Sequence, residues 1–106
     1  MNKLDYFRRF CELSIIIVNR EFNINVSDKT RREEVLFPRY ALTDLFMAEI
    51  ENLDIKKKYG VLIITELFNQ ERTTIYNSIK QHKNLTQVRF DKYTECYGYV
   101  SVLVKI

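Results

Sequence analysis

The sequence of 106 residues contains only two glycines and one proline. This scarcity argues against a β-sandwich, whose many turns require glycine and proline. The glycines, Gly60 and Gly98, are isolated, whereas a loop that cradles nucleotide phosphates needs clustered glycines so that its backbone can approach the anion. The sequence therefore excludes such a loop and the nucleotide-binding enzymes that depend on it.

Residues that carry catalysis or bind metals are also few. His82 is the only histidine, and because no triad motif surrounds it we interpret it as a histidine on a helix surface. Cys11 and Cys96 lie far apart without a second His or Cys at metal-ligand spacing, so we interpret them as small buried hydrophobic residues in a reducing compartment rather than as a disulfide. The adjacent Glu33 and Glu34 indicate solvated charge in a loop. We expect no enzyme activity, no metal site and no cofactor.

Long hydrophobic runs are absent as well. The longest, Ile15 to Val18, is far shorter than the roughly 20 residues that span a bilayer. The N-terminus leads directly into Arg8 and Arg9 and shows no signal peptide. We therefore expect a cytoplasmic protein without a membrane partner.

The chain does contain enough apolar residues to fold as one domain. Hydrophobic residues make up 46% of it and aromatic residues 13%, which can oppose the entropy of the chain. The formal net charge of +3 permits a nucleic-acid partner without requiring one.

The spacing of apolar residues by three and four predicts an all-α fold. We expect helices at Leu4–Val18, Pro38–Leu53 and Lys56–Phe68. Pro38 is expected as the first residue of its helix, where its missing N–H costs nothing. The polar residues 23–34 predict a connecting loop, and Gly60 predicts a kink or a late start in the third helix.

A further helix is predicted after Asn69, whose side chain can cap it. One side of this helix carries Ile75, Ile79 and His82. The opposite side has no carboxylate and many groups that can hydrogen-bond base edges: Gln70, Thr73, Thr74, Asn77, Lys80, Gln81 and Asn84. A solvated helix side would look similar, but a helix ending at Phe68, a tight turn and a second helix with a polar outer face form the layout of a helix-turn-helix. We expect a small helical bundle that contains this motif.

The segment after Thr86 fits two patterns. A helix is favoured by Leu85, Val88, Tyr93, Cys96, Tyr97, Val100, Leu103 and Val104. A strand is favoured by Tyr97, Tyr99, Val100, Val102 and Val104. We prefer the helix, because a lone strand in a helical domain has no partner for its backbone hydrogen bonds.

Two blocks of this sequence resemble the C-terminal DNA-binding domain of the bacterial replication initiator DnaA. The first runs from Glu21-Phe22-Asn23-Ile24 through the basic loop to Val35-Leu36-Phe37-Pro38-Arg39. The second is Leu67-Phe68-Asn69-Gln70-Glu71-Arg72-Thr73-Thr74-Ile75-Tyr76-Asn77-Ser78-Ile79-Lys80, where the family typically reads Leu-Phe-Gly-Gly-Arg-Asp-His-Thr-Thr-Val. The resemblance covers about residues 18–85 and leaves the tail, residues 86–106, unexplained. It implies a Trp-repressor-like helix-turn-helix domain that binds a short box of double-stranded DNA.

The resemblance implies base contacts in the major groove from the start of the motif's second helix. Thr73 and Thr74 match the family's Thr-Thr pair, whose hydroxyl and methyl groups suit that groove. Glu71 and Arg72 stand where the family has Asp and His, so we expect a different preferred base. The expected base-contacting residues are Gln70, Glu71, Arg72, Thr73, Thr74 and Asn77.

Contacts with the DNA backbone or the minor groove are expected from basic residues. Arg39 matches the basic residue that follows the family's proline, and Lys80 lies on the polar helix face. Lys29, Arg31 and Arg32 match the family's basic loop, which lends an arginine to the minor groove, although Glu33 and Glu34 follow it here.

The sequence departs from the family in three respects. The turn at Asn69-Gln70 is one residue shorter, and residues 56–61 form an insertion. The family's initiator also carries an ATPase module before this domain, whereas the match here begins near Val18. We therefore expect a stand-alone accessory factor or regulator of replication or transcription from a bacterium or a phage.

A protein-interaction module on the same scaffold is the alternative hypothesis. The tail is more apolar than a terminus normally requires, so it could dock a partner protein or a second copy of the chain. A last helix that completes the core explains the same residues more simply. The tail residues concerned are Tyr93, Tyr97, Tyr99, Val100, Val102 and Val104.

Overall fold

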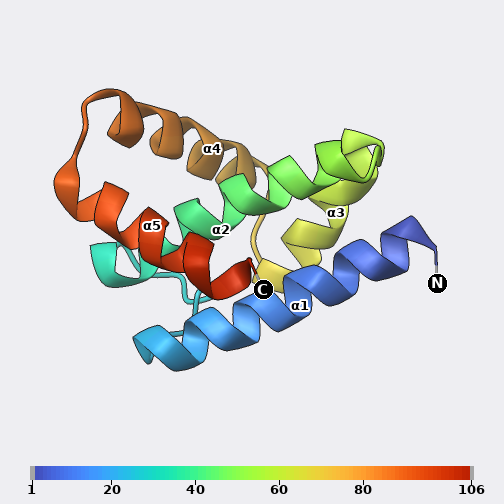
Figure 1. Cartoon of the computed structure of the whole chain (residues 1–106), viewed down its shortest axis with the longest axis horizontal. Coiled ribbons are helices and arrows are strands. Elements are labelled where there is room, and N and C mark those ends of the chain that lie inside the picture. Colours follow the sequence, from blue (N-terminus) through green and yellow to red (C-terminus); the bar gives the residue numbers. More distant parts are fainter. Residues whose placement is uncertain (1, 106) are drawn as a thin grey trace.

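The computed structural model describes residues 2–105. These residues form five α-helices and no β-strand. The helices are α1 (Lys3–Phe22), α2 (Glu33–Asn52), α3 (Lys57–Phe68), α4 (Arg72–Gln87) and α5 (Asp91–Val104). They form a small bundle in which α2 lies at the centre and packs against each of the other four helices (Figure 1). The predicted all-α fold is confirmed.

Helix α1 has an asparagine at each end. The side-chain oxygen of Asn2 accepts a hydrogen bond of 2.9 Å from the backbone N–H of Asp5, which satisfies one amide of the first turn. At the other end, Asn23 adopts a left-handed conformation with φ of 53° and stops the helix. The buried residues Phe7, Cys11 and Val18 lie on one stripe between these caps and join the main core.

Helix α2 begins earlier than the sequence predicts. Its first residue is Glu33, so Pro38 lies inside the helix and not at its first position. The predicted loop, residues 23–34, is correspondingly shorter, and Glu33 and Glu34 form the first turn of α2, where negative charge is favoured by the helix dipole. The additional turn buries Val35 and Phe37, and this burial offsets the backbone hydrogen bond that Pro38 cannot donate.

Helix α3 begins at Lys57 and so includes Gly60, which means that the glycine does not delay the start of the helix. Gly60 is buried, and a Cβ atom at this position would collide with the side chain of Ile50 in α2. The glycine therefore permits a close approach of α3 to α2. At the other end of α3, Asn69 has φ of 52° and donates its backbone N–H to carbonyls of the last turn. Asn69 thus ends α3, whereas the sequence predicted that it caps the next helix.

The tail forms helix α5, so the preferred helical interpretation is confirmed. Tyr93, Val100 and Val104 are buried, and Val100 and Val104 belong to the main core. Tyr93 packs with Phe37 and Tyr40 of α2 in a second cluster, with its ring centroid 5.3 Å from that of Phe37. The last helix therefore completes the bundle.

Neither cysteine forms a disulfide. Cys11 is fully buried and Cys96 is half-buried, and both are free. Burial raises the pKa of both thiols, that of Cys96 to about 11, so both stay protonated at neutral pH.

None of the five helices is long and apolar enough to cross a membrane.

Candidate nucleic-acid interface

Helix α4 has an inner face that packs on the bundle and an outer face that is exposed. Ile75 and Ser78 are buried on the inner face, and the Ser78 hydroxyl donates to the backbone carbonyl of Thr74. The outer face consists of the exposed residues Thr73, Asn77, Lys80 and Asn84. Thr74 and Gln81, which the helical pattern also placed there, are half-buried.

The beginning of α4 presents its side chains to solvent. Arg72 is the first residue of the helix, and Arg72 and Thr73 are both exposed. Glu71 precedes the helix and makes no side-chain capping hydrogen bond, so its carboxylate stays on the surface. The predicted base-contacting residues Glu71, Arg72, Thr73 and Asn77 are thus all accessible. The helix itself contains no carboxylate from Arg72 to Gln87.

Arg39 does not lie where the predicted phosphate contact requires it. Its side chain is only 3% exposed, and its guanidinium donates to the backbone carbonyls of Val26 and Asp28. Burial lowers the pKa of this guanidinium, and the carbonyl oxygens compensate for part of the lost hydration. Arg39 therefore anchors the loop after α1 and is not available to DNA.

Gln70 also has a structural partner. It precedes α4 and does not belong to the helix face on which the sequence placed it. Its side-chain N–H donates to the backbone carbonyl of Ser27 at 3.0 Å, and the Ser27 hydroxyl donates to the carbonyl of Leu67 at 3.4 Å. These bonds join the loop after α1 to the turn between α3 and α4, across about 40 residues of sequence.

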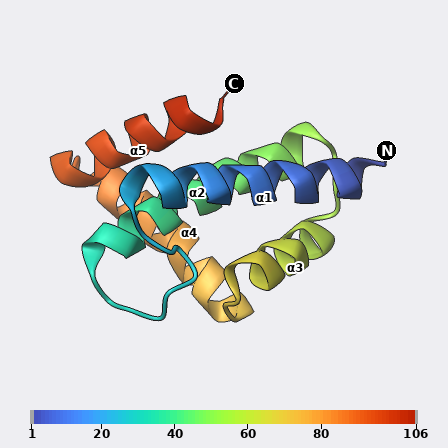
Figure 2. The same ribbon diagram turned by 90° about the horizontal axis from the view of Figure 1, so that it is seen from below.

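The loop of residues 23–32 therefore lies beside the beginning of α4. Figure 2 shows both segments at the same lower edge of the molecule. Lys29 lines a polar hollow together with Asn69, Glu71 and Thr74, and the basic residues Arg31 and Arg32 are exposed in the same loop. The fold thus brings the basic loop and the outer face of α4 to one edge.

One further cationic group beside α4 was not recognised from the sequence. The ammonium group of Lys57, at the start of α3, lies 5.4 Å from the ring centroid of Tyr76, which is exposed on α4. Lys56 and Lys58 flank it and are exposed. The three consecutive lysines were a visible signal, but their distance from α4 depends on how α3 and α4 pack.

His82 is not the surface histidine that we expected. Its side chain is 14% exposed, with Nδ1 at 2.7 Å from the hydroxyl of Tyr93 and Nε2 at 3.4 Å from Oδ1 of Asp44. The hydroxyl of Tyr97 donates to Oδ2 of the same carboxylate at 2.7 Å. The four side chains join α2, α4 and α5. Nothing in the local sequence signals this cluster, because its members are separated by up to 53 residues.

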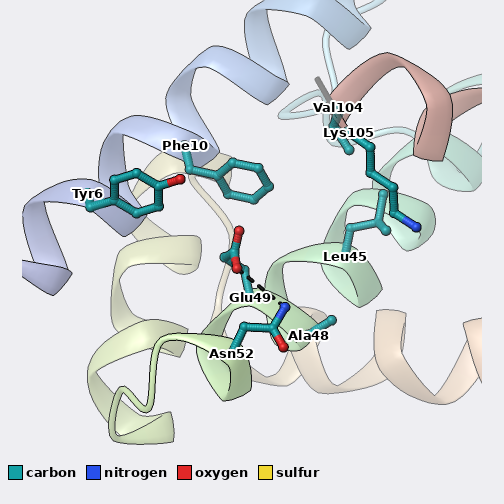
Figure 3. Close-up of a pocket in the computed structure, with 8 residues that line it drawn as sticks. All are labelled: Tyr6, Phe10, Leu45, Ala48, Glu49, Asn52, Val104 and Lys105. Atoms are coloured by element: carbon teal, nitrogen blue, oxygen red, sulfur yellow. Dashed lines mark hydrogen bonds between the residues drawn. The ribbon is translucent and has the colours of Figure 1, made fainter.

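The other side of the bundle holds a pocket of about 280 Å³ between α1, α2 and the end of α5 (Figure 3). Glu49 points into it beside Phe10 and accepts a hydrogen bond from Asn52 at 3.4 Å. Lys105 lies on its rim, so the pocket combines one carboxylate and one ammonium group. None of its lining residues comes from α4 or from the loop of residues 23–32.

Within residues 2–105, no group of His, Cys, Asp or Glu side chains is arranged to hold a metal ion.

No protein-family model, no curated protein and no solved structure matches this chain.

Proposed function

We propose that this chain binds double-stranded DNA with the outer face of α4 in the major groove. A groove about 12 Å wide admits an α-helix, and hydroxyl, amide and guanidinium groups can read base edges there. Thr73, Asn77 and Arg72 supply these groups from exposed positions. A carboxylate-free helix avoids repulsion from the phosphates that line the groove.

The observation that carries this proposal is the position of the basic loop beside the beginning of α4. Lys29 lies at the hollow next to Thr74, although the two residues are 45 positions apart. A duplex engaged by α4 then passes close to the cations of the loop and to Lys57, whose ammonium group lies beside Tyr76 of α4. Contacts between such cations and the DNA phosphates fix the position of the protein along the duplex, while the helix contacts the base edges.

The resemblance to the DNA-binding domain of DnaA supports the same proposal. Residues 69–71 form a short turn between α3 and α4, which is consistent with α3 and α4 as the two helices of a helix-turn-helix. Thr73 and Thr74, at the positions of the family's Thr-Thr pair, lie in the first turn of the proposed reading helix. We infer a replication or transcription accessory factor or regulator of bacterial or phage origin, acting in the cytoplasm without an enzyme activity.

The test is selection from a randomised duplex pool at two salt concentrations, followed by affinity measurements on the enriched sequences. Thr73→Ala or Arg72→Ala is expected to reduce discrimination between preferred and mismatched sites by about 1–3 kcal/mol for each lost base contact. Thr94→Ala, an exposed threonine on α5, is the matched control and should change nothing. A pool without any enriched motif, or equal discrimination in all three variants, would refute the assignment.

A second candidate, docking of a partner protein or a second copy through the tail, is favoured by one observation. On α5, Val102 is 73% exposed and Tyr99 is 48% exposed, although Val100 and Val104 of the same helix are buried in the core. Sedimentation of wild type and Val102→Glu tests it, because the substitution lies outside the core. A concentration-dependent dimer that Val102→Glu abolishes would support docking, and a monomer in both would reject self-association.

A further inference from the structure

The cluster around His82 connects the proposed reading helix to the two helices behind it. His82 belongs to α4, Asp44 to α2 and Tyr93 to α5. The imidazole lies between the other two groups, with 2.7 Å to the Tyr93 hydroxyl and 3.4 Å to the Asp44 carboxylate. A chain of polar contacts thus crosses the interface on which the inner face of α4 rests.

The position of the imidazole proton follows from what the neighbouring groups can do. The Asp44 carboxylate, 3.4 Å from Nε2, has no proton to donate and favours the neutral form of His82 that carries its proton on Nε2. In a neutral imidazole Nδ1 is then an acceptor, and the Tyr93 hydroxyl donates to it. Tyr93 is fully buried, and this is the partner that the structure provides for its hydroxyl.

Protonation of Nδ1 removes this acceptor. The Tyr93 hydroxyl then faces an N–H group, and its own proton has to turn toward a buried environment without a partner, which is costly. The charge itself is also disfavoured, because burial lowers the pKa of His82 below its ordinary value. Asp44 opposes this effect by attracting the imidazolium, but it is the weaker influence.

The ring of Tyr97 lies 4.9 Å from that of His82, and Tyr40 and Cys96 pack in the same cluster as Tyr93; all four groups stay neutral in the relevant range. Burial raises the pKa of Tyr97 to about 12 and that of Cys96 to about 11, and it also raises the pKa of Tyr40 and Tyr93. From α2 and α5, the charge that acts on His82 is that of Asp44. Histidine ordinarily titrates between about pH 5 and pH 8.

We propose that the Tyr93–His82–Asp44 chain holds α4 against α2 and α5 only while the imidazole is neutral, so that mild acid loosens α4. His82 is a positioning residue in this arrangement, since its side chain faces the bundle and not the outer face. If the proposed function holds, loosening of α4 lowers the affinity for DNA as the pH falls. This direction is the opposite of the ordinary one, because added positive charge strengthens binding to phosphates.

The first experiment titrates His82 by NMR in the full chain, where it is the only histidine. Tyr93→Phe removes the donor to Nδ1 and should raise the pKa of His82 toward its ordinary value, whereas Asp44→Asn removes the attracting carboxylate and should lower it further. Tyr99→Phe, whose hydroxyl contacts the exposed Glu21, is the matched control and should leave it unchanged. Equal titration in all four proteins would overturn the proposal.

The second experiment measures hydrogen exchange of α4 amides between about pH 8 and pH 5, corrected for intrinsic exchange rates. Protection of α4 should fall several-fold in wild type and stay constant in His82→Gln, whose amide offers one acceptor and one donor but cannot be protonated. If His82→Gln fails to fold, Tyr93→Phe replaces it, and its α4 should be less protected already at about pH 8. Unchanged protection of wild-type α4 would contradict the proposal.

DNA binding gives the third readout. On an enriched duplex, wild-type affinity should fall by about fivefold across this range, while His82→Gln stays level or gains affinity. A wild-type affinity that is constant or rises would overturn the coupling. A protein that binds no DNA at any pH would refute the proposed function, whereas the titration and the exchange data would still decide whether His82 holds α4.

Discussion

The inner face of α4 buries Ile75 and Ser78 against the bundle, whereas the outer face leaves Thr73, Asn77 and Lys80 exposed. The same division extends to two arginines of the adjoining segments. Arg39 is buried and bonded to the loop, while Arg31 of the loop itself is exposed. Residue type alone therefore does not show which polar groups stabilise the fold and which are exposed and able to bind a ligand. Inward groups should control stability, and outward groups should control binding.

The largest expected effect comes from the inner face. Ile75 is fully buried, and Ile75→Ala should lower the free energy of unfolding by about 2–5 kcal/mol, because it removes apolar contacts and leaves a cavity. Urea denaturation of the variant measures this loss. Asn77→Ala, two residues further on the outer face, is the control and should change stability by less than about 0.5 kcal/mol. Similar losses in both variants would contradict the division between the faces.

The two arginines provide the next test. Arg39→Met keeps the aliphatic bulk but leaves the carbonyls of Val26 and Asp28 without their donor, at a cost of about 1–3 kcal/mol in stability. Faster hydrogen exchange in the loop of residues 23–32 should accompany the loss. Arg31→Met should instead leave stability within about 0.5 kcal/mol of wild type. The comparison fails if the exposed arginine proves as important for stability as the buried one.

A smaller effect is expected from acid. The pKa of His82 is lowered in the folded chain, so the unfolded chain binds the proton more readily. The stability contributed by neutral His82 is therefore complete above the ordinary pKa of about 6.5 and declines as the pH falls below it. Denaturation at several pH values should show this decline in wild type, and His82→Gln should reduce it. Parallel pH profiles for the two proteins would contradict this account.

The smallest effect on stability is expected for Lys80→Ala, within about 0.5 kcal/mol, because Lys80 is exposed on the outer face. Its effect should instead appear in DNA binding, as a decrease of about 1 in the slope of log affinity against log salt. Arg9→Ala, an exposed arginine on α1, is the matched control for charge. An unchanged salt slope for Lys80→Ala would remove Lys80 from the interface.

The helices themselves were predictable because apolar spacing is a local property. The stripe of Phe7, Cys11 and Val18 marked α1, although the helix continues beyond the predicted end at Val18 to Phe22. The same reasoning found α3 and favoured a helix for the tail. Helix boundaries were less predictable. Pro38 and Asn69 are each compatible with a helix start. However, α2 begins at Glu33, before Pro38, and the added turn buries Val35. Asn69 takes a left-handed conformation that ends α3.

The candidate interface was predictable only in part. Arg72, Thr73, Asn77 and Lys80 are exposed, as the sequence predicted. Gln70 and Arg39 were indistinguishable from them by residue type, but each is bonded to the backbone of the loop after α1. Whether any of these side chains contacts DNA stays a prediction.

The sequence by itself determined that the chain is helical and that α4 has one polar face, because both follow from residues three and four positions apart. Only the tertiary structure decided which polar groups are used internally. The partners of Arg39, Gln70 and His82 lie between 11 and 43 residues away along the chain, so their burial depends on how the helices pack. Packing of α2 and α3 likewise places the basic loop and Lys57 beside α4.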